Sequence, residues 1–237
     1  VFRTSLRFTL LAVLLRGTYT AVDKVNIDLS LGRIVGKREG GLYIFLGIPF
    51  AEPPIHTLRF RPSKPKQAWT PQAIECFNFS AMCLQSSLYS QEDDGKKSED
   101  CLYLNVWAPA KPSKQGGYPV LLWIYGGAFM QGSASSPMYI GDRLAARGVV
   151  VVSCNYRLGA LGFMVSTKDG LFGNYGLHDQ KLAMQWVQDH IYAFGGNPDK
   201  VTLFGESAGA MSIGLHLLDQ YGKRLFRAVV LQSNPLG

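Results

Sequence analysis

Residues 205–209, with the sequence GESAG, place a serine between glycines directly after the apolar run VTLF. Small residues allow a sharp turn from a strand into a helix, and such a turn leaves Ser207 exposed at its apex. A serine presented in this way can attack an acyl carbon, so Ser207 is the candidate nucleophile. An ordinary glycine-rich turn would use the same residues, and the five-residue pattern alone is therefore weak evidence.

Acyl transfer also needs hydrogen-bond donors for the oxygen that becomes negatively charged. A helix that begins at Ser207 would direct its first amides, including that of Ala208, toward the reacting centre. A second glycine-rich segment, YGGAF at 125–129, ends another apolar run, and its glycines allow backbone N–H groups to face a ligand. A plain turn would explain this segment alone. Two such bends at the carboxyl ends of parallel strands favour a ligand site.

Apolar runs and helical periodicity alternate in the second half of the chain. They predict buried strands at 119–125, 149–155, 201–204 and 227–232, helices at 176–194 and 207–218, and a short helix within 136–148. This alternation predicts an α/β fold, with a mostly parallel sheet and helices on both of its faces. Earlier in the chain, GRIVG and GLYIFLGIPF suggest antiparallel strands, and a proline-rich segment follows at 51–71. The sequence contains no internal repeat and no linker that would divide it into two domains.

The composition is that of a globular protein: 47% of the 237 residues are hydrophobic and 17% are charged. The net charge is +7, but the basic residues are scattered and do not interleave with aromatic residues, which argues against a nucleic-acid partner. Near the N-terminus, Arg3 and Arg7 precede a short apolar stretch, Phe8 to Leu15, as in a secretory signal. We expect this signal within residues 1–21 and a secreted protein; a buried first strand or helix is the alternative. Eight apolar residues are too few for a stable membrane span.

The chain has four cysteines, and in a secreted chain some of them should be paired. Cys154 lies in the apolar run VVVVSCNY and is expected to be a free thiol in the core. Cys83 and Cys101 bracket the polar loop 84–100, which a disulfide between them would restrain. Asn78 opens the sequon NFS and is the candidate glycosylation site.

Longer motifs reveal a family resemblance. The segments EDCLYLNVW (99–107) and FGESAGA (204–210) resemble two signatures of the type-B carboxylesterase and lipase family, which includes cholinesterases and bile-salt-activated lipase. GIPFAEPP, LRF, YGGAF, NYRLG, GNYGLHDQ and AFGGNPDKVTLFG occur in the family's order, and the match runs from about Gly32 to the last residue. The resemblance implies an α/β-hydrolase fold and hydrolysis of carboxylic esters through an acyl-enzyme.

The resemblance also implies roles for individual residues. Ser207 would be the nucleophile, and the amides of Gly127, Ala128 and Ala208 would form the oxyanion hole. Ala128 stands where the family usually has a third glycine, and an alanine amide can serve as well. Glu206, beside the nucleophile, would tune the local field rather than act as the triad acid. The pair Cys83 and Cys101 matches the family's first disulfide.

A catalytic triad also requires a histidine base and an acid that orients it. The chain has four histidines: His56, His178, His190 and His216. His216 lies nine residues after Ser207 on the same expected helix, about 13 Å along it, and points away. We expect the other three to be surface or packing residues. In the family the acid and histidine follow well after the serine. We therefore interpret residues 22–237 as the N-terminal part of an esterase domain, truncated after the strand that follows the nucleophile helix and inactive by itself.

The expected substrate is a small-molecule or lipid carboxylic ester, and we expect no cofactor and no metal site. Cholinesterases hold a quaternary ammonium with a tryptophan in the first disulfide loop. Loop 84–100 has no tryptophan, which disfavours choline esters. The alternative is a non-catalytic binding or adhesion relative, or a decayed gene fragment. The intact Ser207 and the oxyanion glycines favour the enzyme.

Overall fold

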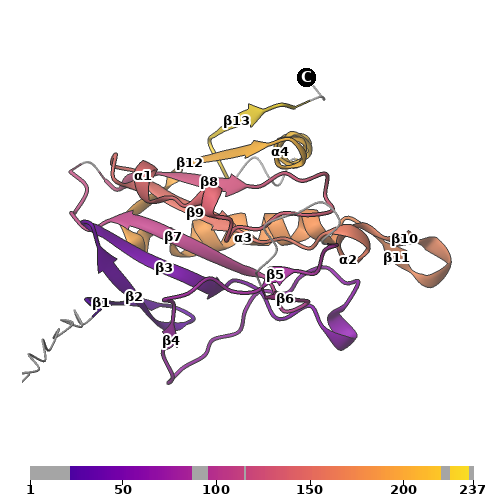
Figure 1. Cartoon of the computed structure of the whole chain (residues 1–237), viewed down its shortest axis with the longest axis horizontal. Coiled ribbons are helices and arrows are strands. Elements are labelled where there is room, and N and C mark those ends of the chain that lie inside the picture. The colour runs from indigo at the N-terminus through magenta and orange to yellow at the C-terminus, as the bar shows by residue number, and fades with distance from the viewer. Residues whose placement is uncertain (1–21, 87–95, 115, 220–224, 235–237) are drawn as a thin grey trace, which may run out of the picture.

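The computed structural model describes residues 22–86, 96–114, 116–219 and 225–234. These residues form one nine-stranded mixed sheet whose main path runs β1-β2-β3-β7-β9-β8-β12-β13, with β4 paired to β2 (Figure 1). The expected secretory segment, residues 1–21, lies outside the described residues.

The first half of the sheet is antiparallel. Its strands are β1 (Lys24–Leu29), β2 (Gly32–Glu39), β3 (Leu42–Pro49) and β7 (Tyr103–Pro109), and β7 pairs antiparallel with β9 (Val150–Cys154). The short strand β4 (Ile74–Glu75) runs parallel to β2. The antiparallel strands expected from GRIVG and GLYIFLGIPF are confirmed as β2 and β3, whereas β1 and β7 were not predicted.

The second half of the sheet is parallel, as the alternating pattern predicts. It runs β9, β8 (Tyr118–Ile124), β12 (Gly196–Glu206) and β13 (Ala228–Gln232). β12 is longer than the predicted strand at 201–204: it begins at Gly196, which pairs with Tyr118 of β8, and the register shifts between Gly196 and Val201. The parallel strands therefore form one half of a mixed sheet, and their carboxyl ends share one edge.

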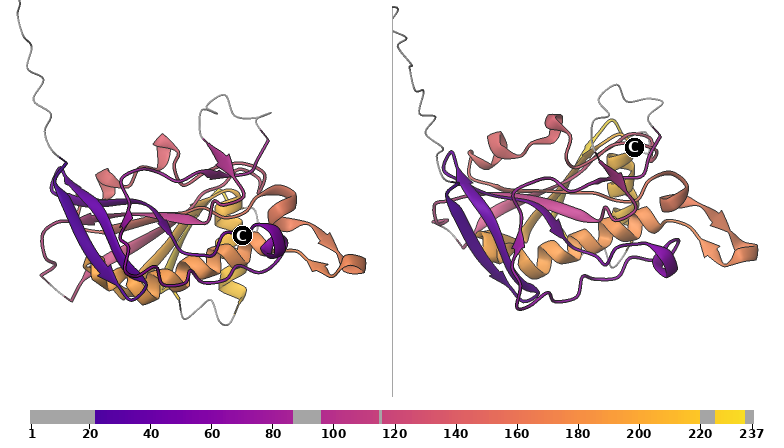
Figure 2. Two further views of the ribbon diagram at one scale, coloured as in Figure 1. Left: turned by 90° about the horizontal axis from the view of Figure 1, so that it is seen from below. Right: turned by 60° about the horizontal axis from the view of Figure 1, so that its bottom comes forward.

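Helices cover both faces of this sheet (Figure 2). The long helix α3 (Tyr175–His190) lies on one face, and a 3₁₀ turn, η5 (Ile191–Phe194), extends it to Gly195. Helix α4 (Ala208–Leu218) begins directly after β12 and packs on β12 and β13. The opposite face carries the 3₁₀ turn η3 (Pro137–Tyr139) and α1 (Asp142–Ala145), so the short helix expected within 136–148 has a single α-helical turn.

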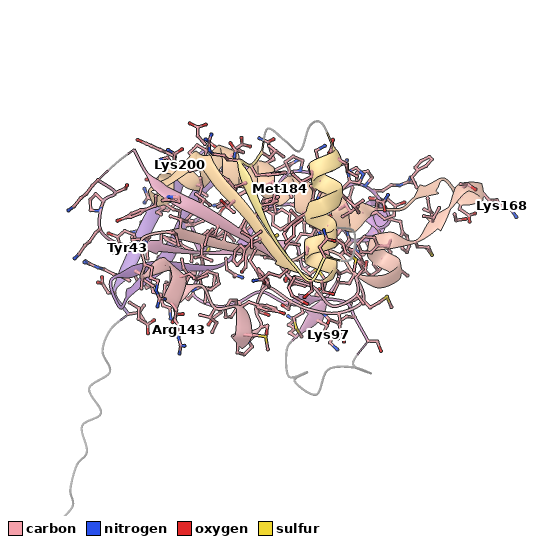
Figure 3. All side chains as sticks on the ribbon, turned by 90° about the horizontal axis from the view of Figure 1, so that it is seen from above. Tyr43, Lys97, Arg143, Lys168, Met184 and Lys200 are labelled. Atoms are coloured by element: carbon pink, nitrogen blue, oxygen red, sulfur yellow. A yellow bond between two sulfur atoms is a disulfide. The ribbon has the colours of Figure 1, made fainter. Side chains whose placement is uncertain are left out.

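A few short elements lie outside the main sheet and the helices that cover it. They are η1 (His56–Leu58), β5 (Met82–Cys83), β6 (Lys97–Ser98), α2 (Gly159–Phe163), β10 (Val165–Ser166), η4 (Thr167–Asp169) and β11 (Leu171–Phe172). β10 and β11 pair antiparallel and form a hairpin that projects from the body, with Lys168 near its tip (Figure 3).

The strands separate two hydrophobic clusters. Val150 and Val152 of β9 belong to the large cluster, while Val151, between them, belongs to a smaller cluster with Trp107 and Ala145 of α1. This alternation follows from the two-residue period of a strand. The central strands are thus buried on both faces, which explains their continuous apolar sequences.

All four cysteines are buried. Cys83 and Cys101 form a disulfide with their Cα atoms 4.9 Å apart, as expected. Cys154 is a free thiol in the core, as predicted, and Cys76 is a second one. Burial raises the pKa of each free thiol to about 12, so neither is a thiolate near neutral pH.

Candidate active site

Ser207 occupies a one-residue turn between β12, which ends at Glu206, and α4, which begins at Ala208. Its backbone has φ 53° and ψ −122°, a conformation that costs a non-glycine residue about 1–3 kcal/mol. Hydrogen bonds on both sides fix this conformation. The Ser207 amide donates to the carbonyl of Gln232 (2.9 Å), and the Ser207 carbonyl accepts from the amide of Met211 (2.9 Å).

The glycines around Ser207 are required by close packing against the end of β8. A β-carbon at Gly205 would lie 2.7 Å from the Ile124 carbonyl oxygen, and one at Gly209 would collide with the same oxygen. A β-carbon at Gly126 would lie 2.5 Å from the carbonyl oxygen of Glu206. The turn itself is made by Ser207, whose φ is positive, and not by the glycines next to it.

The second glycine-rich segment forms a tight loop beside Ser207. Three successive residues have positive φ: Gly127 (108°), Ala128 (55°) and Phe129 (61°). The carbonyl of Gly127 accepts hydrogen bonds from the amides of Met130 (3.0 Å) and Gln131 (3.1 Å), which closes the turn. We call residues 126–132 the oxyanion loop. Its position next to the serine follows from the approach of Gly126 to Ser207, where an added β-carbon would lie 3.1 Å from the Ser207 β-carbon.

Three backbone N–H groups are available near the Ser207 hydroxyl. Within the described ranges, the amides of Gly127 and Ala128 donate to no other group. The amide of Ala208 lies in the first turn of α4, where a helix has no internal acceptor. The Ser207 hydroxyl likewise makes no hydrogen bond to any residue that the structure describes. The arrangement combines a hydroxyl and amide donors that have no hydrogen-bond partner among the described residues.

Glu206 lies between the oxyanion loop and an aromatic cluster. Its Oε2 would be 2.8 Å from a β-carbon at Gly126. Burial, together with the Glu206 charge, raises the pKa of Tyr139. The Tyr139 ring packs on Trp123, with 5.0 Å between centroids, and Trp123 packs on Phe204 at 4.7 Å.

These aromatic side chains line a pocket of about 280 Å³ on the α1 face of the sheet. The lining includes Trp123, Tyr139, Ile140, Val151, Phe204 and Gln232. Sequence reasoning did not identify Trp123 or Tyr139 as site neighbours. The only available signal was the presence of aromatic residues within and after the strand that leads to the oxyanion loop.

The four histidines have the surface or packing positions that we expected. His216 is buried, with Nε2 2.9 Å from Oε1 of Gln180, and burial lowers its pKa to about 4. His190 packs on Trp186, with 5.2 Å between ring centroids, and burial lowers its pKa as well. His56 and His178 are exposed. Across the described ranges, no hydrogen bond joins a histidine to Ser207.

The remaining expected sites lie on the surface or in the polar loop. Asn78 is exposed, as glycosylation would require, and its use stays a prediction. Residues 87–95 of the loop between Cys83 and Cys101 are not described.

The described residues include no cluster of three or more His, Cys, Asp or Glu placed to hold a metal ion. No helix among them is long and apolar enough to cross a bilayer.

Comparisons with known proteins place this geometry among esterases. A model described as the carboxylesterase family matches residues 23–236. Acetylcholinesterase of Danio rerio is 46% identical over 223 residues, which cover 87% of this chain and 35% of that protein. Fumonisin B1 esterase of Sphingopyxis macrogoltabida is 46% identical over 205 residues, which cover 84% of this chain and 38% of that protein. Para-nitrobenzyl esterase of Bacillus subtilis is 43% identical over 213 residues, which cover 87% of this chain and 43% of that protein.

The solved structures agree with the sequence comparisons. A thermophilic para-nitrobenzyl esterase superposes with a TM-score of 0.82 at 41% identity, covering 88% of this chain and 44% of that one. The fold is therefore that of an α/β hydrolase, as the motifs implied. The chain spans less than half the length of each of these relatives.

Proposed function

Because the chain belongs to the carboxylesterase family, we propose that it supplies the nucleophile and the oxyanion hole of a carboxylic ester hydrolase that works through a serine acyl-enzyme. The observation that carries this proposal is the conformation of Ser207. A strained serine at the end of β12, with an unbonded hydroxyl beside free amides, has no evident structural purpose. A nucleophile presented to an acyl carbon accounts for all of these features.

In the proposed reaction, Oγ of Ser207 attacks the carbonyl carbon of the ester. The carbonyl oxygen gains negative charge and accepts hydrogen bonds from the amides of Gly127, Ala128 and Ala208. Collapse of this intermediate expels the alcohol and leaves the acyl group on Ser207, and water then releases the acid. Glu206 places a carboxylate beside the reacting centre and adjusts its field.

The hydroxyl proton of Ser207 must pass to a base, which then returns it to the oxygen of the departing alcohol. We propose that the base is a histidine outside the described residues, oriented by an acid that also lies outside them. The share of the relatives' length that this chain covers supports the interpretation of residues 22–237 as the N-terminal part of a catalytic domain.

The substrate is proposed to be a small-molecule carboxylic ester, with a lipid ester as the alternative. The relatives are named acetylcholinesterase, fumonisin B1 esterase and para-nitrobenzyl esterase, so family membership does not select one ester. The absence of tryptophan from loop 84–100 disfavours choline esters.

The secretory pathway is the proposed location. The disulfide between Cys83 and Cys101 fits an oxidising compartment. The apolar N-terminal segment and the exposed sequon at Asn78 support the same location. A non-catalytic binding protein of the same fold remains the second candidate, and the intact nucleophile and oxyanion loop favour the enzyme.

The test is hydrolysis of p-nitrophenyl acetate by the complete gene product that contains this chain. Ser207→Ala is expected to lower kcat at least about 10⁴-fold, because the acyl-enzyme can no longer form. Ser233→Ala is the matched control, since Ser233 also has a positive φ (53°) and lies at the end of the neighbouring strand β13. Equal activity in the Ser207→Ala and Ser233→Ala proteins would refute the assignment of the nucleophile.

A further inference from the structure

The oxyanion loop is attached to the rest of the molecule by hydrogen bonds at its beginning, middle and end. Before the loop, the Tyr156 hydroxyl donates to the carbonyl of Tyr125 (2.8 Å). In the middle, the amide of Gly159 donates to the carbonyl of Phe129 (2.7 Å). At the end, both backbone groups of Gly132 are bound by one side chain, that of Gln85.

Gln85 pairs with Gly132 in both directions. Its Oε1 accepts from the Gly132 amide (2.8 Å), and its Nε2 donates to the Gly132 carbonyl (2.9 Å). The same Nε2 also donates to the carbonyl of Cys83 (3.0 Å). The side chain is therefore oriented by the backbone next to the disulfide and in turn orients the last residue of the oxyanion loop.

Gly132 transmits this restraint to the start of the loop. It has φ 118°, and a β-carbon there would lie 2.5 Å from the Tyr125 ring and 2.8 Å from the Gly126 carbonyl oxygen. The two ends of the loop thus touch at Gly132. A displacement of Gly132 would shift Gly126 and the turn between them, which contains Gly127 and Ala128.

The segment that follows Gly132 is held by hydrogen bonds that do not involve Gln85. The contacts of Gln85 therefore restrain the oxyanion loop and not this following segment. The amide of Ala134 donates to Oδ1 of Asn155 (2.9 Å), and the carbonyl of Ala134 accepts from Nδ2 of Asn105 (3.3 Å). These bonds fix the following segment to β7 and to the end of β9. Within the part of the chain that the structure describes, the side chain of Gln85 hydrogen-bonds both Gly132 of the loop and Cys83 of the disulfide.

We propose that Gln85 is a positioning residue that sets the geometry of the oxyanion amides, and that the disulfide holds Gln85 in place. This inference rests on the proposed function, because it assumes that the loop amides bind the oxyanion. Gln85 carries no charge and does not touch the reacting atoms. Its effect follows from the strong dependence of acyl transfer on the position of the donors.

The test measures amide hydrogen exchange in the 237-residue chain. Gln85→Met keeps the approximate size of the side chain and removes all three hydrogen bonds, so exchange of the hydrogen-bonded loop amides of Met130, Gln131 and Gly132 is expected to rise about tenfold or more. Gln85→Glu keeps the acceptor for the Gly132 amide and loses both donor bonds, so an intermediate rise is expected.

Gln188→Met is the matched control. Nε2 of Gln188 also donates to two carbonyls, those of Pro198 and Leu225, both at 2.9 Å, but these carbonyls lie outside the oxyanion loop. This variant is expected to leave exchange at 126–132 unchanged. Unchanged exchange in both Gln85 variants, or an equal rise in Gln188→Met, would overturn the proposal.

A second measurement separates positioning from general stability. In the complete gene product, Gln85→Met is expected to lower kcat for p-nitrophenyl acetate about tenfold and to leave KM within about twofold, because the loop amides act mainly in the transition state. Faster loop exchange with an unchanged kcat would overturn the positioning role. An inactive wild-type protein would instead refute the proposed function, and the exchange experiment would still decide whether Gln85 holds the loop.

Discussion

At the scale of single residues, the candidate site depends on where a β-carbon fits and where it does not. Ser207 has a β-carbon and a positive φ, and its backbone hydrogen bonds to Gln232 and Met211 maintain that conformation. Gly205 and Gly209 have ordinary φ values, but the carbonyl oxygen of Ile124 leaves no space for a side chain at either position. The serine must be strained because the strand and the helix on either side of it pack so closely.

Two glycines of α4 allow a direct test of this packing. Gly209→Ala is expected to destabilise the fold by about 3 kcal/mol or more, because the new β-carbon would collide with the backbone of β8. At Gly214 the nearest atom to an added β-carbon is 3.5 Å away, so Gly214→Ala is expected to be neutral or stabilising by up to about 1 kcal/mol. Denaturant unfolding of both variants checks the difference, and equal stabilities would contradict the packing argument.

Sequence motifs identified the chemical groups of the site but not the residues that support them. Ser207 and the YGGAF segment could be recognised because each belongs to a short, contiguous motif. Gln85 lies 47 residues from Gly132, and Tyr156 lies 31 residues from Tyr125, so only the folded chain brings each pair together. A glutamine near a disulfide has no pattern of its own that would reveal its partner.

At the scale of elements, a buried polar contact joins α4, which begins after Ser207, to α3. The amide group of Gln180 donates to Oγ of Ser212 (3.1 Å), and its Oε1 lies 2.9 Å from Nε2 of His216. The Ser212 hydroxyl donates in turn to the carbonyl of Ala208 (2.8 Å). The first residue of α4 is thereby connected to α3 through buried hydrogen bonds. Removing one partner of such a bond costs more free energy than the bond itself contributes, because the other buried group is left without a partner.

This contact makes the stability of the fold depend on pH. Burial lowers the pKa of His216 from 6.5 to about 4; Asp219 opposes this shift, while Lys181 and His178 add to it. Above pH 6.5 the ring is neutral in both folded and unfolded chains. Between pH 6.5 and 4 the unfolded chain binds the proton and the folded chain does not, so the free energy of unfolding should fall by up to about 3 kcal/mol.

Denaturant unfolding at several pH values, with His216→Gln as the comparison, measures this contribution. Glutamine can donate to Oε1 of Gln180 but does not titrate in this range. The stability of the wild type is expected to fall more steeply than that of the variant as the pH drops from 6.5 to 4. Parallel profiles would show that His216 does not cause the dependence.

The elements that could be predicted are those with strong local patterns. Continuous apolar runs gave β8, β9 and β13, and helical periodicity gave α3 and α4. The structure adds β1 and β7, which were not predicted, and the early residues of β12, where Asn197, Pro198 and Asp199 interrupt the apolar pattern. This early part of β12 begins at Gly196, which pairs with Tyr118 of β8 before the register shifts ahead of Val201, so its place in the sheet depends on a neighbouring strand and not on the local pattern.

At the scale of the whole molecule, the described residues contain one side of the proposed catalytic centre. The carboxyl edge of the parallel strands carries Ser207 and the oxyanion loop, while the four histidines lie at other contacts or on the surface. Among the described strands, β13 pairs with β12 only, and Val230 on it is 47% exposed. The relatives are more than twice as long as the matched region.

The 237-residue chain by itself is therefore expected to show no measurable turnover of p-nitrophenyl acetate. Without a base the Ser207 hydroxyl stays protonated near neutral pH, and oxyanion donors alone provide a small part of the rate enhancement. Assays of the purified chain and of the complete gene product under the same conditions check this. Turnover by the isolated chain that is lost in Ser207→Ala would mean that one of its own histidines is the base.

The most direct test of the central claim is the identification of the acylated residue. The complete gene product is mixed with p-nitrophenyl acetate, quenched in acid within the first turnovers and digested, and its peptides are mapped by mass spectrometry. An acetyl group on Ser207, absent from the Ser207→Ala protein and still present on Ser207 in the Ser233→Ala protein, is the predicted result. Ester turnover with Ser207 unmodified, or with the acetyl group on another residue that the reaction requires, would contradict the account.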